Sequence, residues 1–377
     1  MPDYRDVGVP GRRAPNRRDA GPSPERGPRA RARSAAPPDR PRGAGRARAG
    51  TCGPCPGDPQ EPTLEVIPRP QEVHIMSRTV TVGLDGSPES RAAAEWAARE
   101  AQLRGLPLKL VHVWEAVPPA MAQAPLLGAE THRHWTERIP REAAEGLRLR
   151  HPGLEIATRQ LSGGSVVTCL TDEAREAELL VLGSRGMSAL GGFLVGSVGL
   201  AVAAHARGPV AFVRAAEQAA DEHVPDPAGI PSAATPFRPV VVGVDTGRPD
   251  AVVLGFAFEE AARRRTALRA LHGWFPPYYY AYGLPADPEL QQELEKEQAA
   301  ALATALRPWR EKYPDVEVAE DVRCGAPALQ LVDAAPEASL VVVGRRTRRL
   351  PLGPHTGSVT HAVLHHAAAP VVVVPHD

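Results

Sequence analysis

The 377-residue sequence predicts two tandem α/β domains, each an open five-stranded parallel sheet with helices on both faces, preceded by a disordered N-terminal tail. Three observations support this fold class. Short apolar runs alternate with longer amphipathic segments, most of the runs lack a polar face, and the whole pattern occurs twice. Strands that are apolar on both faces and alternate with helices indicate parallel sheets covered on both sides, with right-handed crossovers.

The N-terminal stretch differs in composition from the rest. Residues 1–76 are rich in Arg, Pro, Gly and Ala and have almost no aliphatic pattern, so we expect a disordered extension. Its arginines are compatible with weak nucleic-acid binding, but prolines and interspersed acids dilute the charge, which favours a solvated tail. Because a strand-like segment begins just after Met76, we expect Met76 to be the true start. Recovery of native peptides from residues 1–75 would contradict this.

The remainder of the chain contains two copies of one pattern. The first copy aligns Asp85 with Asp245 of the second, an offset of 160 residues. The matching segments are TVTVGLDGSPES (79–90) with PVVVGVDTGRPD (239–250), LLVLGSRG (179–186) with LVVVGRRT (340–347), and GSVGLAV (196–202) with GSVTHAV (357–363). We therefore predict domains at 77–215 and 238–377, joined by a proline-interrupted linker at 216–237.

Within each copy the predicted elements follow one order. In the first copy we expect five strands: one at 79–84, a second that ends at Trp114, and three more at 154–161, 179–183 and 209–214. The expected helices lie at 88–104, 132–150, 164–177 and 197–206. In the second copy the five strands lie at 239–244, in a second segment that ends at Trp274, and at 315–322, 339–344 and 370–375. The helices lie at 249–265, 288–312, 326–337 and 358–367.

Composition narrows the function classes. The formal net charge of +0 argues against a wholly basic nucleic-acid binder. No apolar run is long enough to span a membrane and no apolar signal core is apparent, so we expect a cytoplasmic protein with no membrane partner. Cys52 and Cys55 form a CxxC pair without a second ligand pair, which does not support a metal or redox site.

The glycine-rich stretch after the fourth strand is the sharpest functional signal. Twelve residues, Ser184 to Val195, separate this strand from the next helix, whereas such loops usually have about 2–6 residues. Gly183 and Gly186 would let backbone N–H groups point inward, and Ser197 adds a hydroxyl at a helix N-terminus. A flexible surface loop is the alternative interpretation. Recurrence of the spacing at Gly344 and in the Gly357–Ser358 pair favours an anion site instead.

The pattern G-x2-G-x9-G-S, the Asp after the first strand and the His in the second strand together resemble the universal stress protein family, in its tandem-domain, ATP-binding form. The resemblance covers about residues 77–376 and implies a Rossmann-like, adenine nucleotide alpha hydrolase-like fold that binds ATP, with Mg²⁺ as a further expectation. It implies a first site of Asp85, Val113, Gly183, Arg185, Gly186, Gly196, Ser197 and Val198. It implies a second site of Asp245, Gly344, Arg346, Gly357, Ser358 and Val359.

The second copy departs from this pattern. Thr347 replaces the middle glycine, so we expect backbone strain and a side chain where phosphate would approach, and Pro354 removes a further donor. The arginines of the RRTRR run (345–349) would supply positive charge instead, or form a solvated basic loop. On this basis the first domain is the better candidate site.

Other polar residues have two interpretations. Asp85 and Asp245 could accept from a ribose hydroxyl or hold Mg²⁺, or could shape the turn and cap the next helix. His112 and His272 lie mid-strand among apolar residues, so we expect hydrogen-bonded core histidines rather than catalytic ones.

The function predicted from these features is an ATP-binding stress-response regulator or sensor, not a dedicated catalyst. No Walker A lysine or catalytic triad order is apparent. An adenylyl-transferring or slow ATP-cleaving enzyme and a structural protein that pairs surfaces without nucleotide are the alternatives. We also expect the last strands, 209–215 and 370–376, to pair the two copies as a pseudo-two-fold unit. A homodimer and an unidentified regulatory protein are further expected partners.

Overall fold

The computed structural model describes residues 78–114, 129–188, 192–194, 196–215, 217–276, 288–347 and 356–377, and at 129–136, 185–188 and 192–194 it describes the backbone only. These residues all belong to one compact unit, Glu72–Asp377. The predictions of a disordered extension and of a start at Met76 concern residues outside this part and stay predictions.

The first copy contains the predicted elements in the predicted order. They are β1 (Val80–Leu84), α1 (Pro88–Arg104), β2 (Leu108–Val113), α3 (Ala129–Arg150), β3 (Ile156–Leu161), α4 (Val166–Glu176), β4 (Leu179–Ser188), β5 (Gly192–Leu194), α5 (Ser197–His205) and β6 (Val210–Arg214). Local capping explains two of the helix starts: the Ser87 and Ser165 side chains accept from the backbone N–H groups of Ser90 and Thr168 at the first turns of α1 and α4.

The second copy repeats this order. Its elements are β7 (Val240–Gly243), α6 (Ala251–Arg264), β8 (Leu268–Trp274), α7 (Pro288–Lys312), β9 (Val318–Cys324), α8 (Pro327–Ala334), η3 (Ala335–Glu337), β10 (Leu340–Arg346), α9 (Ser358–His366) and β11 (Val371–His376). Between the copies, the linker forms one 3₁₀ turn, η1 (Ala219–Glu222). The Glu222 carboxylate in this turn accepts from Trp96 Nε1 at 3.2 Å and from Arg99 at 2.6 Å, which ties the linker to α1.

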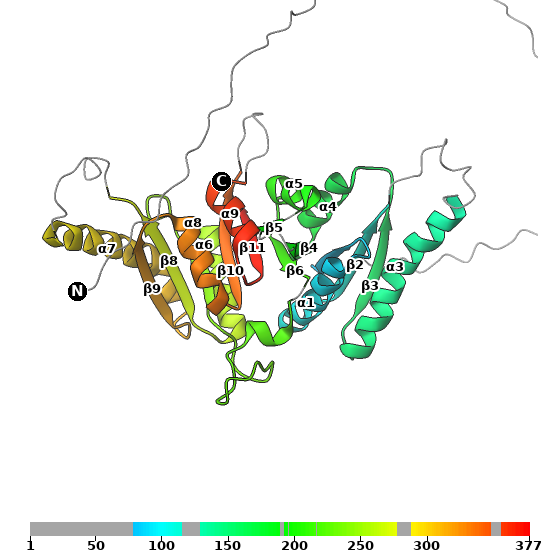
Figure 1. Cartoon of the computed structure of the whole chain (residues 1–377), viewed down its shortest axis with the longest axis horizontal. Coiled ribbons are helices and arrows are strands. Elements are labelled where there is room, and N and C mark those ends of the chain that lie inside the picture. Colours follow the sequence, from blue (N-terminus) through cyan, green and yellow to red (C-terminus); the bar gives the residue numbers. More distant parts are fainter. Residues whose placement is uncertain are drawn as a thin grey trace, which may run out of the picture. The chain divides into compact units, whose positions relative to one another are not determined.

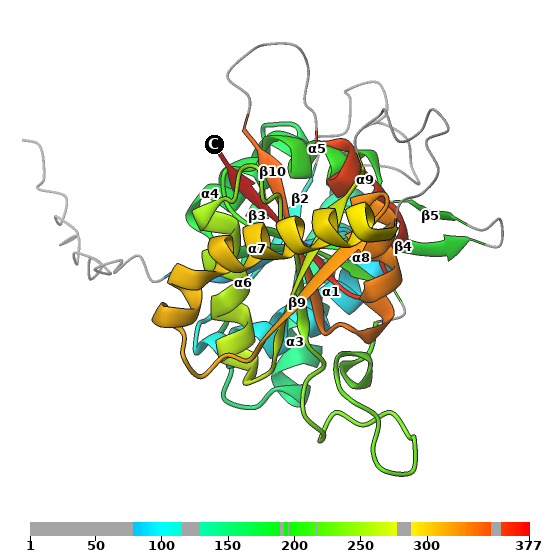
Figure 2. The same cartoon turned by 90° about the vertical axis from the view of Figure 1, so that its left-hand side faces the viewer.

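The strands form a parallel sheet within each copy, and helices cover both faces (Figures 1 and 2). Side chains of α1, α3, α6 and α7 pack into the core on one face, and those of α4, α5, α8 and α9 pack into the core on the other. Strand residues such as Val80, Leu180 and Val342 are fully buried because both faces are covered. The apolar runs therefore predicted the strands correctly.

The two copies join through their last strands. β6 and β11 pair antiparallel, with Val371 opposite Phe212 and Val373 opposite Val210. This confirms the predicted pairing of the last strands. As a result, the strand order β3-β2-β1-β4-β6-β11-β10-β7-β8-β9 is continuous across the junction. Pairing satisfies the backbone groups that two apolar edge strands would otherwise expose.

We predicted that the glycine-rich stretch of the first copy, Ser184 to Val195, is a loop. The structure shows instead that part of it is strand. β4 continues to Ser188 and pairs antiparallel with β5, with Arg185 opposite Leu194 and Ser188 opposite Gly192. The sequence GSRGMS has neither an apolar run nor strict alternation, so its strand character arises from pairing with β5 rather than from local pattern.

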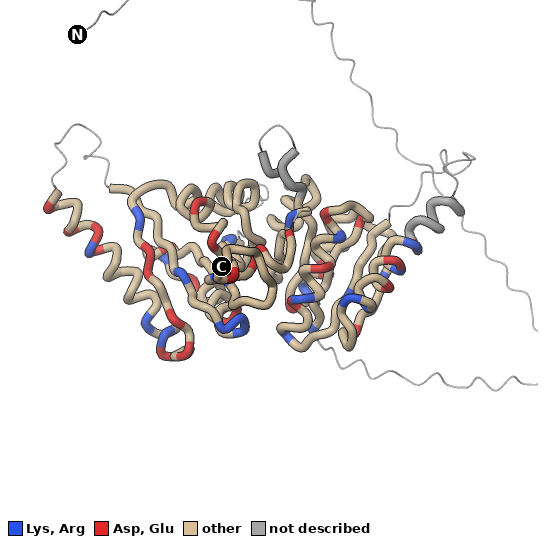
Figure 3. Tube along the Cα trace, turned by 60° about the horizontal axis from the view of Figure 1, so that its bottom comes forward, with Lys and Arg blue, Asp and Glu red and all other residues tan. Residues whose placement is uncertain are grey.

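Charged residues of both signs are interspersed over both copies (Figure 3). Within the described residues, no helix combines the length and apolarity that a membrane span requires. The same residues contain no group of three or more metal-ligating side chains arranged to hold an ion. The cytoplasmic location stays a prediction.

Candidate nucleotide site in each copy

A cavity of about 600 Å³ lies at the carboxyl ends of β1, β2 and β4 in the first copy. Its walls combine apolar side chains from the strands and α4 with polar groups at the first turns of α1 and α5. The lining residues are Gly83, Leu84, Asp85, Ser87, Glu89, Ser90, Val111, Val113, Val166, Leu170, Leu182, Gly183, Gly196, Ser197, Val198 and Gly199. Six of the eight residues predicted for this site are therefore brought together.

The two remaining predicted residues, Arg185 and Gly186, lie in β4 beyond Gly183. The structure describes their backbone but not the surroundings of their side chains. Their predicted contact with a ligand stays a prediction.

Asp85 shapes the turn that leads into α1. Its Oδ1 accepts hydrogen bonds from the backbone N–H of Ser87 at 3.0 Å and from Ser87 Oγ at 2.5 Å. Burial raises the pKa of the Asp85 carboxyl, but the bonds from Ser87 and Ser90 outweigh it and bring the pKa below its usual value. The carboxylate is thus held ionised at the cavity wall, although Ser87 and not Asp85 caps the helix.

Gly183 is small for a reason other than the one predicted. A Cβ placed on it would lie 2.5 Å from the carbonyl carbon of Glu89 and 2.7 Å from the backbone nitrogen of Ser90. The first turn of α1 thus packs directly on this glycine, and its space is taken by protein backbone. Expected phosphate contact does not explain the missing side chain at this position.

Gly196 behaves differently, because it faces open space. It is the N-cap of α5 with φ −60° and ψ 161°, makes no side-chain cap, and a Cβ there would meet nothing within 4 Å. The first N–H groups of a helix have no partner within the helix, so an end without a side-chain cap leaves donors for a ligand. Ser197 and Val198 are exposed beside it. This corner of the cavity therefore combines open space with the N-terminus of α5.

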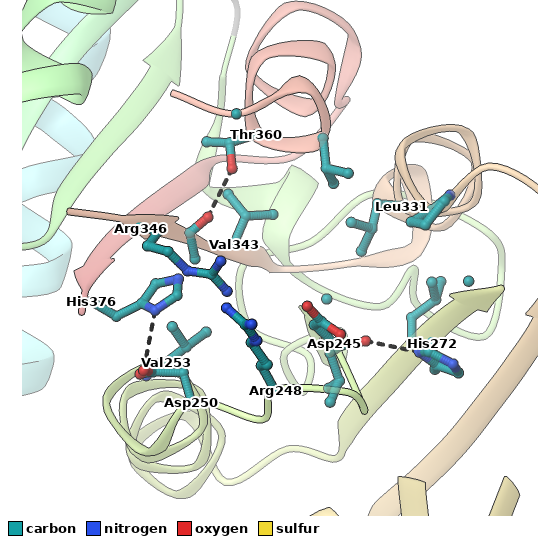
Figure 4. Close-up of a pocket in the computed structure, with 18 of the residues that line it drawn as sticks. Asp245, Arg248, Asp250, Val253, His272, Leu331, Val343, Arg346, Thr360 and His376 are labelled. Carbon is teal, nitrogen blue, oxygen red and sulfur yellow. Dashed lines mark hydrogen bonds and ion pairs between the residues drawn. The ribbon is translucent and has the colours of Figure 1, made fainter. Parts of the chain in front are cut away.

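The second copy has a matching cavity of about 520 Å³ at the carboxyl ends of β7, β8 and β10 (Figure 4). All six predicted residues line it: Asp245, Gly344, Arg346, Gly357, Ser358 and Val359. Gly357 is the N-cap of α9, again without a side-chain cap, and its φ of 84° is one that side chains rarely adopt. The glycine at this helix start is therefore required by the backbone.

Thr347 does not enter this cavity, contrary to expectation. Its hydroxyl donates to Asp377 Oδ1 at 2.6 Å and its N–H donates to the carbonyl of His376 at 2.6 Å. Arg265 is the one non-glycine residue of the described chain with a positive φ, so the predicted backbone strain at Thr347 is also absent there. Continued pairing of β10 with β11 turns this residue away. Pro354 lies outside the described residues.

The strand histidines are hydrogen-bonded in the core, as predicted. The Nδ1 atom of His112 lies 2.7 Å from the carbonyl oxygen of Leu84, and Nδ1 of His272 lies 3.0 Å from that of Val244. Both residues are 7% exposed. His272 nevertheless reaches the second cavity, where its Nε2 lies 3.3 Å from Thr246 Oγ1.

Arg248, Asp250 and His376 are among the cavity residues of the second copy that were not predicted. Asp250 caps α6 by accepting from the N–H groups of Val252 and Val253, and its Oδ2 lies 3.1 Å from Nδ1 of His376. Arg248 stands shortly after Asp245 in a loop at the expected edge of the sheet, a signal that could have been used. His376 lies far along the chain and only the fold brings it here.

A doubled parallel sheet with a cavity at the carboxyl ends of the strands in each half defines a tandem Rossmann-like α/β protein. The chain belongs to the universal stress protein family, whose profile matches residues 76–214 and 236–375.

Known proteins resemble the chain over one copy or over most of its length. A universal stress protein of Mycobacterium tuberculosis (strain CDC 1551 / Oshkosh) is 37% identical over 326 residues, covering 79% of this chain and 96% of the relative. The crystal structure of a universal stress protein from Archaeoglobus fulgidus covers 79% of this chain and 98% of its own, with a TM-score of 0.55 and 16% identity, and so supports the fold. A universal stress protein solved in complex with cAMP matches 37% of this chain at 25% identity, with a TM-score of 0.27.

Proposed function

We propose that the chain binds ATP in both cavities and acts as a nucleotide-dependent regulator or sensor of a stress response, not as a dedicated catalyst. The observation that carries this proposal is the recurrence of one arrangement. In each copy a helix of nine residues begins at an N-terminus without a side-chain cap, faces a cavity, and presents a Gly-Ser pair to it.

The dimensions and lining suit a nucleotide. Ligand pockets usually measure about 300–1,000 Å³ and combine apolar walls with a few placed polar groups. In the first cavity Val111, Val113 and Leu170 offer an apolar surface for a base, while Asp85 offers a carboxylate for ribose hydroxyls. In the second, Leu271, Leu331 and Asp245 are placed in the same way.

Mg²⁺ would need most of its ligands from phosphate and water, because the described residues include no cluster of three metal-ligating side chains. Asp85 and Asp245 are the carboxylates that would contribute at each cavity. A homodimer and a regulatory protein partner stay predictions from the sequence.

Mass spectrometry of freshly purified protein under non-denaturing conditions tests this function by counting bound nucleotide per chain. We expect up to two molecules in the wild type and one fewer in the Gly196→Trp variant, whose side chain would fill the first cavity. Absence of bound nucleotide, together with no heat on titration with ATP, would overturn the proposal. Steady release of AMP or pyrophosphate would favour the enzyme alternative.

A further inference from the structure

The second cavity carries a pair of arginines that approach each other without an acidic partner. Arg248 extends from the loop between β7 and α6, and Arg346 extends from the end of β10. Figure 4 shows their guanidinium groups directed toward one another within the cavity. Both residues are exposed, and among the described residues neither guanidinium group makes a hydrogen bond or an ion pair.

The nearby carboxylates are already engaged. Asp250 accepts from two backbone N–H groups at the start of α6, and its Oδ2 lies 3.1 Å from Nδ1 of His376. Asp245 accepts from the N–H of Gly247 at 3.1 Å. Because both arginines are exposed, solvent screens their mutual repulsion, and what they offer to an anion placed between them is two sets of charged N–H donors.

The position of His376 adds to this arrangement. A Cβ on Gly344 would lie 2.9 Å from Nε2 of His376, so the imidazole lies directly over the first glycine of the motif. The space beside Gly344 is thus filled by a side chain, and the open part of the cavity is the part that Arg248 and Arg346 face. An anionic group in this site would be bound by side chains in addition to the α9 N-terminus.

The first cavity offers an internal comparison. At the offset of 160 residues, Arg248 corresponds to Pro88, the first residue of α1. The described lining of the first cavity contains Asp85 and Glu89 and no lysine or arginine. Helix α1 begins about one turn earlier than α6, so the first copy has Pro88 where the second copy has Arg248. The two cavities therefore differ in charge at this position.

We propose that the second cavity selects nucleotides that carry a polyphosphate chain, and that Arg248 and Arg346 together bind the terminal phosphates. This inference rests on the proposed nucleotide function and specifies which nucleotides the second site takes. A guanidinium pair can grip two neighbouring phosphates of ATP or ADP, whereas the single phosphate of AMP cannot span both.

Calorimetric titration in the Gly196→Trp background, where the first cavity is filled, tests the selectivity. We expect ATP to bind at least about tenfold more tightly than AMP, and Arg248→Ala and Arg346→Ala each to weaken ATP binding by about tenfold or more. AMP binding should change little, and Arg248→Lys should restore part of the loss. Arg307→Ala, which removes an exposed arginine on α7 outside the cavity, serves as the matched control and should change neither affinity.

Equal affinity for ATP and AMP, or an equal loss of both on Arg248→Ala, would overturn the selectivity while leaving nucleotide binding in place. Inorganic tripolyphosphate provides the separate arm. If it binds in an Arg248-dependent way while no nucleotide binds, the arginine pair is an anion site and the nucleotide function fails. If neither binds, both proposals fail.

Discussion

Nη2 of Arg104 in α1 donates to Oε1 of Glu260 in α6 at 2.7 Å, across the junction between the two copies. The arrangement is reciprocal, because Arg264 of the second copy donates to Glu100 of the first, and each glutamate also pairs with the arginine of its own helix. The equivalent residues are again 160 apart, and all four side chains are at most 3% exposed. This buried quartet and the β6–β11 pairing fix how the copies meet.

Removing the charge of one glutamate of the quartet should destabilise the folded protein, because two buried guanidinium groups would lose a carboxylate. We expect Glu260→Gln to lower the free energy of unfolding by about 3–5 kcal/mol, measured by urea denaturation. Glu317→Gln, an exposed change in the same copy, should stay within about 0.5 kcal/mol. A loss for Glu260→Gln no larger than that of this control would show that the quartet does not stabilise the junction.

Glu217 should make stability depend on pH. Burial, assisted by Glu222 and Asp221, raises the pKa of its carboxyl to about 8, against an ordinary 4.5. The folded state therefore holds a proton that the unfolded chain releases, and the stabilisation present below pH 4.5 is lost as the pH rises to about 8. We expect a slope of at most about 1.4 kcal/mol per pH unit in this range, which Glu217→Gln should flatten. Identical pH profiles of unfolding for the two proteins would contradict this assignment.

Two glycines of the first cavity should differ in how much stability they lose on substitution by alanine. Gly183→Ala forces a methyl group against the backbone of Glu89 and should cost about 1–3 kcal/mol of stability. Gly196→Ala places its methyl group in open space at an ordinary φ and should cost no more than about 1 kcal/mol. Thermal unfolding of both variants checks the contrast, and equal losses would mean that α1 does not pack on Gly183 as described.

Arg345 of the second copy should stabilise the junction between the two copies. Its Nη1 donates to the carbonyl of Ala204 at 3.0 Å and its Nη2 donates to that of Ala206, at the C-terminal end of α5. We expect Arg345→Met to lower stability by about 1–3 kcal/mol, because these carbonyls lose a charged donor. Arg346→Met, one position along but directed into the cavity, should leave the denaturation midpoint nearly unchanged. Similar losses in the two variants would argue against a role for Arg345 at the junction.

The sequence by itself determined the doubled α/β architecture and the place of the candidate site. Apolar runs such as VVVG (240–243) are buried on both faces of a parallel sheet, so they appear in the sequence as strands without a polar side. Likewise the spacing of Gly196 and Ser197 after β4 placed a helix N-terminus at the carboxyl edge of the sheet, where open sheets bind ligands.

Only the tertiary structure decided what occupies the space beside each motif glycine. The backbone of Glu89 covers Gly183, and the ring of His376 covers Gly344, although the two glycines occupy equivalent positions. Such contacts join residues far apart in the chain, and local pattern contains no signal for them. The charge of the second cavity was hidden for the same reason: Arg248 and Arg346 meet because a parallel sheet brings the ends of separate strands to one edge, not because they are neighbours in sequence.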